Sequence, residues 1–252
     1  MKIENVSWES DAIKITGEIY LPPPSAAPRP GLLLCHGIPA GVKAPDDRGY
    51  PLLAERFCRE GFGVLIFNFR GCGSSGGNFD LPGWTRDLKA GLDFFASRRV
   101  VNPRRTFLMG FSAGAAVSIC VAAERKDVAG VVSCASPADF DDLVGGTGAA
   151  DFLARAREVG IVRDPSFPGS FEEWKKGFEE VKPIDCIEKI PSRPLLLIHG
   201  GRDDVVEKGH AERLYAKVRN ASELFLIDDA DHRLRLNERA MDKALEWLKD
   251  KT

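Results

Sequence analysis

The sequence of 252 residues contains no apolar run near the ~18–20 residues that a membrane-spanning helix requires. Its first residues, MKIENVSWESD, also lack the charged and then apolar layout of a secretory signal. The 35 Lys and Arg residues and the 37 Asp and Glu residues give a net charge of −2, and no long block carries one sign. We therefore expect a cytoplasmic protein that binds neither membranes nor nucleic acids.

Paired cysteines, internal repeats and low-complexity tracts are missing too. The six cysteines stand singly, mostly in apolar runs, and none forms a C-x-x-C pair: Cys35, Cys58, Cys72, Cys120, Cys134 and Cys186. This spacing predicts reduced core residues, without disulfides and without a metal site. The length suits one α/β domain that buries a full core.

Short apolar runs alternate with helix-period segments over most of the chain. The runs are largely uninterrupted, which is typical of strands buried on both faces of a parallel sheet. They are Gly31–Cys35, Gly63–Phe69, Thr106–Phe111, Gly130–Cys134, Leu195–Ile198 and Glu223–Ile227. The segments between and after them predict helices over Pro51–Arg59, Trp84–Ser97, Ala113–Glu124, Glu207–Val218 and Asn237–Asp250, the last with an apolar stripe that starts at Leu236. The fold class is therefore α/β, with a mostly parallel sheet wrapped by helices.

Two segments depart from this alternation. Residues 1–21 alternate as an antiparallel hairpin does, which predicts two further strands at one edge of the sheet. Residues 137–191 carry no buried-strand signal, so we expect an insertion of short helices, at about 138–190, that caps one end of the sheet. We interpret residues 1–252 as a single domain with this cap.

Residues 110–114 read GFSAG, a G-x-S-x-G pattern between an apolar run and a helix of small residues. A strand, a tight turn and a helix in this order predict a nucleophile elbow, in which flanking glycines relieve crowding and Ser112 projects above the sheet edge. The amide of Ala113 would stand at a helix start, where it can hold a developing oxyanion.

A serine nucleophile needs a base, and the base needs a carboxylate that orients it. His232 follows the last apolar run in a loop and is the favoured base, whereas His210 falls inside a predicted helix and is interpreted as a solvated residue. Asp203 and Asp204 follow the run before it, and one of them is expected to meet the imidazole. The other acids of the final loop are competitors for that position: Asp228, Asp229 and Asp231.

Two further loops follow predicted strands. The turn His36–Gly37–Ile38 is predicted to direct the backbone N–H of Ile38 into the site as a second oxyanion donor. Residues 71–76 spell G-x-G-x-x-G, the pattern of a dinucleotide site, but residues 78–83 delay the next helix to near Trp84, so no helix N-terminus would hold the phosphate. We interpret this stretch as a tight structural loop, with Arg70 bracing it by hydrogen bonds to neighbouring backbone.

Together these segments resemble the α/β-hydrolase superfamily over nearly the whole chain: HG at 36–37, NFRGCGSSGG at 68–77, GFSAG at 110–114, HGGRDDVV at 199–206 and DADH at 229–232. Within it the chain looks like small serine esterases related to cinnamoyl and feruloyl esterases and like the catalytic domains of prolyl-oligopeptidase-like enzymes. It departs from the peptidases, which carry a β-propeller before the core and tend to have tyrosine where Ala113 stands. By this resemblance the triad acid is Asp203.

The sequence thus predicts a serine carboxylesterase that acts on a small-molecule ester and needs neither cofactor nor metal. Ser112, His232 and Asp203 would form the catalytic triad, and Ile38 and Ala113 the oxyanion hole. Alternatives are a peptidase or amidase with the same triad, a non-catalytic binding scaffold and an oxidoreductase. Five cap residues are candidates for lining an acyl pocket, with packing of the cap onto the core as the alternative: Phe140, Phe152, Leu153, Phe171 and Trp174. The oligomeric state does not follow from the sequence.

Overall fold

We describe the fold from a computed structural model of the chain, which describes all residues except 25–26, 42–46, 48, 99, 191–192 and 219–221. Among the described residues, one mixed sheet contains eight strands. They are β1 (Lys2–Ser10), β2 (Ile13–Leu21), β3 (Arg29–Cys35), β4 (Gly63–Asn68), β5 (Val101–Phe111), β6 (Val128–Cys134), β7 (Leu195–Gly200) and β8 (Ser222–Ile227). The expected α/β fold with a mostly parallel central sheet is confirmed.

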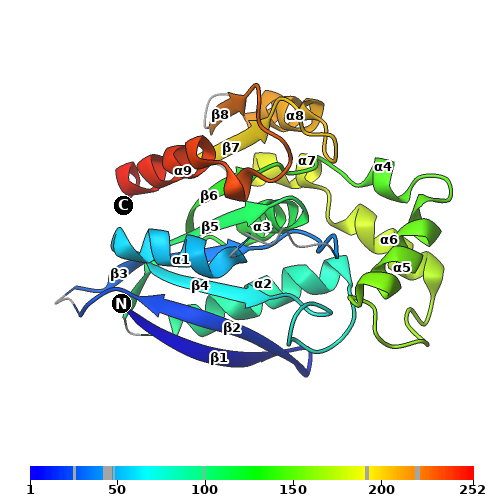
Figure 1. Cartoon of the computed structure of the whole chain (residues 1–252), viewed down its shortest axis with the longest axis horizontal. Coiled ribbons are helices and arrows are strands. Elements are labelled where there is room, and N and C mark those ends of the chain that lie inside the picture. Colours follow the sequence, from blue (N-terminus) through cyan, green and yellow to red (C-terminus); the bar gives the residue numbers. More distant parts are fainter. Residues whose placement is uncertain (25–26, 42–46, 48, 99, 191–192, 219–221) are drawn as a thin grey trace.

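The sheet order is β1-β2-β4-β3-β5-β6-β7-β8, and β3 to β8 run parallel to one another. The hairpin β1–β2 joins antiparallel at one edge, where Glu18 of β2 pairs with Ile66 of β4. Figure 1 shows this hairpin at the bottom of the sheet and β8 at the top. Because parallel strands end at the same edge, the loops after β3, β5, β7 and β8 meet there.

Helices cover both faces of the sheet. The larger ones are α1 (Gly49–Arg59), α2 (Leu81–Ala96), α3 (Ala113–Glu124), α8 (Lys208–Val218) and α9 (Glu238–Asp250). The apolar residues of α1 and α9 belong to one buried cluster, and those of α2, α3 and α8 belong to a second cluster on the other face. Helices α1, α2, α8 and α9 each bury one apolar stripe, whereas α3 is buried on nearly every side from Ala113 to Ala122. This burial is the main source of stability for helices of this length.

Helix starts differ from the sequence predictions most at α1 and α2, and α1 begins at Gly49 rather than at Pro51. Helix α2 begins at Leu81 rather than near Trp84, because Pro82 in its first turn needs no backbone N–H partner. Helix α9 begins at Glu238, so Leu236 lies in the short helix η3 (Leu234–Leu236) and is 47% exposed, outside the apolar stripe.

The insertion between β6 and β7 consists of short helices: α4 (Asp141–Val144), α5 (Gly148–Val159), α6 (Phe171–Glu180), α7 (Pro183–Cys186) and η1 (Ile187–Lys189). Figure 1 shows α4, α5 and α6 at one end of the molecule, beyond the ends of the strands. Its aromatic side chains pack on one another and on the core: Phe152 and Phe178 contact the ring of Phe79, and the Trp174 indole donates a hydrogen bond to the Phe79 carbonyl.

The G-x-G-x-x-G stretch is a loop between β4 and α2, with a buried ion pair at its start and backbone hydrogen bonds within it. The guanidinium of Arg70, 4% exposed, contacts the fully buried Asp87 carboxylate of α2 at 2.7 Å and also reaches Asp11 and Ser10 of the hairpin. The expected bracing by Arg70 is therefore directed at side chains rather than at backbone carbonyls. Positive φ angles at Gly71, Gly73 and Gly77 explain the glycines, since other residues rarely adopt them.

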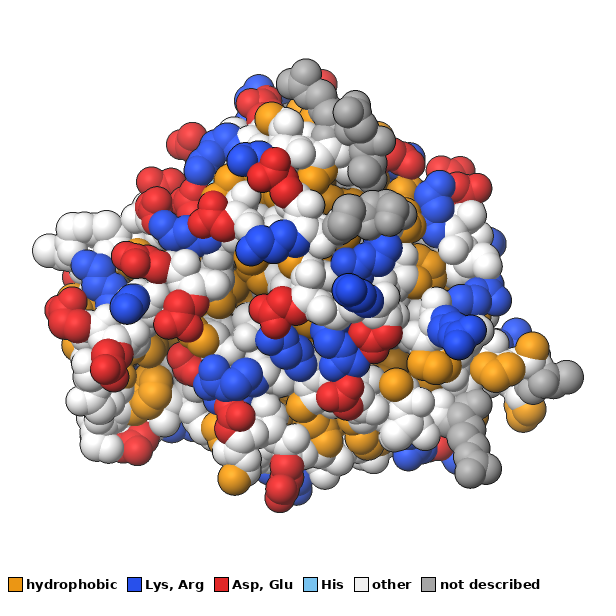
Figure 2. Space-filling view, turned by 180° about the vertical axis from the view of Figure 1, so that it is seen from behind, with side chains coloured by type: hydrophobic (Ala, Val, Ile, Leu, Met, Phe, Trp, Pro, Cys, Tyr) orange, Lys and Arg blue, Asp and Glu red, His pale blue; other side chains and the backbone are white. Residues whose placement is uncertain are grey.

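The surface carries mixed charge. Figure 2 shows acidic and basic side chains interspersed over one face, without a large patch of one sign. Within the described part of the chain, no helix is both long enough and apolar enough to span a bilayer. All six cysteines have free thiols, and Cys186 alone among them is partly exposed.

Candidate active site

Ser112 lies in a strained turn between β5 and α3. Its φ of 52° and ψ of −126° are unfavourable for a residue with a side chain, so the surrounding structure must impose them. The neighbouring glycines allow this turn: a Cβ on Gly110 would lie 2.4 Å from the Gly114 oxygen, and a Cβ on Gly114 would lie 2.3 Å from the His36 oxygen. The amide of Ser112 donates to the Cys134 carbonyl at the end of β6, which fixes the turn above the sheet edge.

His232 and Asp203 come from the loops after β8 and β7, which are joined by backbone hydrogen bonds. The amide of Gly201 donates to Ile227, and that of Arg202 donates to Ala230. These bonds bring the two loops together, and the His232 Nδ1 lies 2.8 Å and 3.0 Å from the two carboxylate oxygens of Asp203. The carboxylate accepts, so Nδ1 carries the proton and Nε2 is left as the basic nitrogen.

The Asp203 carboxylate is buried, and protein groups donate hydrogen bonds to it. Burial by itself raises its pKa, whereas hydrogen bonds from His199, His232 and the Val206 amide lower it more, so the net pKa lies well below the usual range. The Val205 and Val206 amides donate at 3.0 Å and 2.8 Å. Asp203 is therefore an anion held in one orientation, which suits a group that fixes an imidazole tautomer.

Ser112 and His232 both line one cavity at the strand ends. The hydrogen bonds that the structure describes do not include one between their side chains. Hydrogen bonds between a nucleophile and its base are often long before substrate binds. The pairing of Ser112 with His232 therefore rests on the cavity that both line and on the oriented imidazole, not on the distance between the two side chains.

The two backbone amides predicted to form an oxyanion hole, those of Ile38 and Ala113, belong to segments next to Ser112. Ala113 is the first residue of α3, and the amide of a first helical residue has no partner in its own helix. Gly37 packs against the nucleophile, because a Cβ there would lie 2.9 Å from the Ser112 Cβ. The candidate oxyanion loop is thus in contact with the elbow.

His36 sets the direction of the Ile38 amide. Its Nε2 accepts from the Phe69 amide at 3.1 Å, and burial lowers its pKa, so the neutral ring carries its proton on Nδ1 and donates it to the Gly37 carbonyl at 2.7 Å. In a trans peptide the C=O and the next N–H point in opposite directions. The Ile38 N–H therefore points away from the His36 ring.

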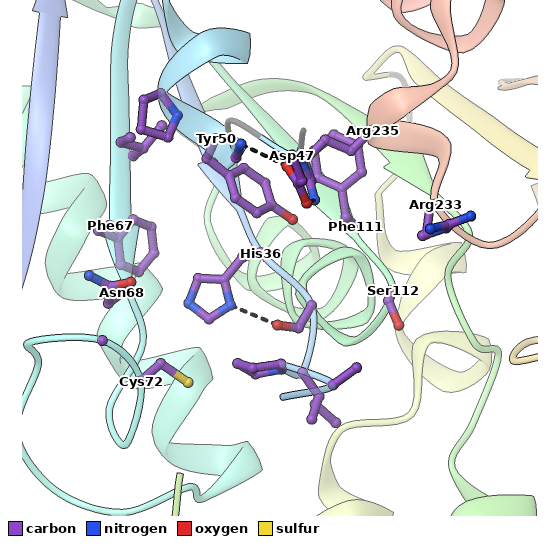
Figure 3. Close-up of a pocket in the computed structure, with 18 of the residues that line it drawn as sticks. His36, Asp47, Tyr50, Phe67, Asn68, Cys72, Phe111, Ser112, Arg233 and Arg235 are labelled. Atoms are coloured by element: carbon purple, nitrogen blue, oxygen red, sulfur yellow. Dashed lines mark hydrogen bonds and ion pairs between the residues drawn. The ribbon is translucent and has the colours of Figure 1, made fainter. Parts of the chain in front are cut away.

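The cavity has a volume of about 630 Å³ and extends from Ser112 to strands β2 and β4. Figure 3 shows Phe67 and Asn68 on one side of the view, Ser112 on the other, and His36 and Tyr50 between them. No described residue of the cap lines this cavity. The five cap candidates therefore pack the cap onto the core, as the alternative interpretation held, and the walls come from the core itself.

Sequence reasoning missed Tyr50 and Arg235, both of which line the cavity. Arg235 forms a bidentate ion pair with Asp47, with distances of 2.6 Å and 2.5 Å, and its guanidinium lies 5.1 Å from the Tyr50 ring centre. The Tyr50 ring also contacts those of His36 and Phe111, beside the oxyanion loop and the nucleophile. Neither residue belongs to a sequence motif. Their contact partners are far away in the chain, so no local pattern indicates them.

The remaining candidates lie outside the site. Asp204 is exposed, Asp229 pairs with Arg239 and Asp231 pairs with Arg233. The interpretation of His210 as a solvated residue is wrong. Its ring is largely buried, and its Nδ1 accepts from the Ala138 amide at 3.0 Å, which attaches α8 to the start of the cap.

Comparison with known proteins agrees with this arrangement. The sequence model of the alpha/beta hydrolase family matches residues 32–246, which include the elbow, the oxyanion loop and the loops of Asp203 and His232. The chain belongs to the α/β hydrolase family. Membership of this family supports hydrolase chemistry at the cavity.

Curated relatives of this hydrolase are moderately similar. The uncharacterized protein Rv2307c of Mycobacterium tuberculosis is 29% identical over 218 residues, which is 86% of this chain and 67% of that protein. The uncharacterized protein YfhR of Escherichia coli K12 is 30% identical over 175 residues, which is 68% of this chain and 53% of that protein. The matched region thus spans about two thirds of the first relative and about half of the second.

Among solved structures, the esterase Pf2001 of Pyrococcus furiosus has a TM-score of 0.71 at 23% identity, over 99% of this chain and 92% of that one. The α/β hydrolase GrgF of a Penicillium species has a TM-score of 0.75 at 16% identity, over 100% of this chain and 99% of that one. At these identities, both comparisons support the fold.

Proposed function

We propose that this protein is a serine hydrolase that cleaves carboxylic esters through an acyl-enzyme intermediate. The observation that carries the proposal is that a serine in a strained elbow lines one cavity together with a histidine that an aspartate from another loop orients. Esterases among the structures of the same fold are consistent with an ester substrate. An amide hydrolase could use the same triad, so the experiment below includes an amide.

In this mechanism the Ser112 hydroxyl attacks the ester carbonyl while Nε2 of His232 takes its proton. Asp203 holds the imidazole and stabilises its cationic form, and the amides of Ile38 and Ala113 donate to the tetrahedral oxyanion. The imidazolium then protonates the leaving alcohol. Water, activated by the same His232, hydrolyses the acyl-serine ester and releases the acid.

We retain three further sequence predictions as parts of this proposal. The chain forms a single domain whose insertion at about 138–190 is a cap, it acts in the cytoplasm on a small-molecule ester, and it needs no cofactor. The packing of the cap aromatics on Phe79 favours a cap that stabilises the core rather than one that selects the acyl group.

Hydrolysis of 4-nitrophenyl esters graded by acyl length, with matched anilides, tests the proposal. We expect ester hydrolysis by the wild type and a fall of about 10³-fold or more in kcat for both Ser112→Ala and His232→Ala. Full activity in Ser112→Ala would contradict the proposal. Faster hydrolysis of the anilides than of the esters would change the substrate class to amides.

A further inference from the structure

Among the lining residues that the structure describes, the charged side chains of the cavity are paired with opposite charges, with one exception. Arg235 pairs with Asp47, His232 pairs with Asp203, and Arg233 pairs with Asp231. The remaining charged residue among the described residues of the cavity wall is Glu18 on β2. Within this part of the chain, the cavity therefore contains one carboxylate that no ion pair balances.

The contacts of Glu18 support this view. Its carboxylate accepts a hydrogen bond from the Tyr20 hydroxyl and, within the described residues, forms no ion pair. Tyr20 is 2% exposed, and the burial of its hydroxyl, together with Glu18, raises its pKa, so the phenol remains a donor. Glu18 is itself half-buried. The phenol fixes one carboxylate oxygen and leaves the other acceptor positions for a ligand.

The position of Glu18 places this charge far from the reacting serine. Glu18 pairs with Ile66 of β4, and β4 and β3 separate β2 from β5, the strand that ends directly before Ser112. Three strand spacings correspond to about 14 Å across the sheet. A substrate bound at Ser112 would therefore reach Glu18 with the far end of its acyl or alcohol group.

We propose that Glu18 is a specificity-determining residue that binds an ammonium group at the end of the cavity remote from Ser112. The inference rests on the proposed ester hydrolysis and names a substrate class for it: esters that carry a cationic group on a long acyl or alcohol chain. A carboxylate in a partly enclosed cavity attracts such a cation and disfavours an anion, since an unpaired charge there loses part of its hydration.

The test compares isosteric esters that differ in terminal charge. One series is 4-nitrophenyl esters of ω-trimethylammonio acids and of the matching branched neutral acids, at several chain lengths, and a second series carries the same groups on the alcohol. The readout is the ratio of kcat/KM for the cationic ester to that for the neutral ester. We expect a ratio of about ten or more in the wild type at one chain length, which corresponds to about 1.4 kcal/mol of attraction between the cation and the carboxylate.

Two variants and a control assign the preference to the cavity wall. Glu18→Gln keeps an acceptor for Tyr20 and should bring the ratio close to one, and Glu18→Lys should favour an ester that ends in a carboxylate. Glu55→Gln on α1 removes a charge that also acts on Tyr20 but does not line the cavity, and should keep the cation preference.

The outcomes separate this inference from the proposed function. A wild type that hydrolyses neutral esters through Ser112 without any cation preference in either series would overturn the role of Glu18 and leave the esterase proposal intact. A Glu18→Gln variant in which kcat/KM falls for both the cationic and the neutral ester, while their ratio stays high, would also overturn the role of Glu18. A wild type that hydrolyses neither ester, and does not react with a fluorophosphonate, would instead contradict the esterase proposal.

Discussion

At the scale of single residues, Ser112 and Asp203 are held in place by different means. The backbone of Ser112 is held in a strained conformation by a turn whose glycines, Gly110 and Gly114, lie close to it in the sequence. Asp203 is held by hydrogen bonds from the His199 and His232 rings and from two backbone amides. The first arrangement is local and was predictable from GFSAG, whereas the second depends on two loops that meet only in the fold.

Replacing the two neighbouring acids separately tests the assignment of the triad carboxylate. Asp203→Asn should lower kcat for ester hydrolysis by about 10³–10⁴-fold, because an amide at this position favours the wrong imidazole tautomer. Asp204→Asn, which changes an exposed neighbour, should alter kcat by less than about threefold. Steady-state kinetics of both variants provides the measurement, and equal losses in the two would contradict the assignment.

The residues alone left Asp203 and Asp204 open, and the resemblance to the superfamily decided between them. The structure gives the physical difference: one side chain is buried against His232 and the other faces solvent. Tyr50 and Arg235 were not predictable, because an aromatic residue and an arginine outside any motif acquire their contacts only from distant segments.

At the scale of secondary-structure elements, the elbow depends on how closely α3 approaches β3. The first turn of α3 contacts the backbone at the end of β3, where a Cβ on Gly114 would lie 2.4 Å from the Cys35 oxygen. Backbone oxygens in a central strand have little room to move, so this contact fixes the position of the helix start and of Ser112 with it.

Gly114→Ala should therefore destabilise the fold by at least about 2 kcal/mol, through overpacking against backbone. Gly209→Ala in α8 is the matched control, since nothing lies within 4 Å of its added Cβ, and it should change the free energy of unfolding by no more than about 1 kcal/mol, in the stabilising direction. Urea denaturation of both variants measures this. Similar changes in the free energy of unfolding of the two variants would show that the contact between α3 and β3 at Gly114 does not limit stability.

The strands were the most predictable elements, because β3, β4, β6 and β7 and the part of β5 from Thr106 onwards are largely buried on both faces and read as apolar runs. The mostly polar, partly exposed start of β5, from Val101, was not predicted. Helix starts were less predictable. Residues 78–83 were interpreted as delaying α2, although Pro82 among them is compatible with a first helical turn. Leu236 matched a helical spacing without belonging to the helix. Periodicity finds the body of an element but not its ends.

At the scale of the whole molecule, the cavity is assembled from segments that are far apart in the sequence. β2 and β4 supply one end, the loop after β3 and the start of α1 supply a wall, and Ser112, His232 and Arg235 supply the other end. The sequence predicted that catalytic loops would meet at one sheet edge, and it offered cap residues as candidates for the lining, with packing onto the core as the alternative. The shape of a cavity depends on packing that no local pattern encodes.

Stability against acid should report the environment of Asp203. A carboxylate whose pKa is lower in the folded state stabilises the fold above its unfolded pKa of about 3.9, and this stabilisation is lost as the pH falls through the folded pKa. The free energy of unfolding of the wild type should thus exceed that of Asp203→Asn most near pH 6–7, and the difference should shrink below about pH 4. Urea denaturation between pH 7 and pH 3 measures it, and a difference independent of pH would contradict this expectation.

The central claim is that Ser112 is a nucleophile activated by His232 and Asp203. Intact-mass spectrometry after treatment with a fluorophosphonate, followed by peptide mapping, tests it most directly. We expect one covalent adduct on Ser112 in the wild type, slow labelling in His232→Ala and none in Ser112→Ala. An unlabelled wild type, or an adduct on another residue, would contradict the account.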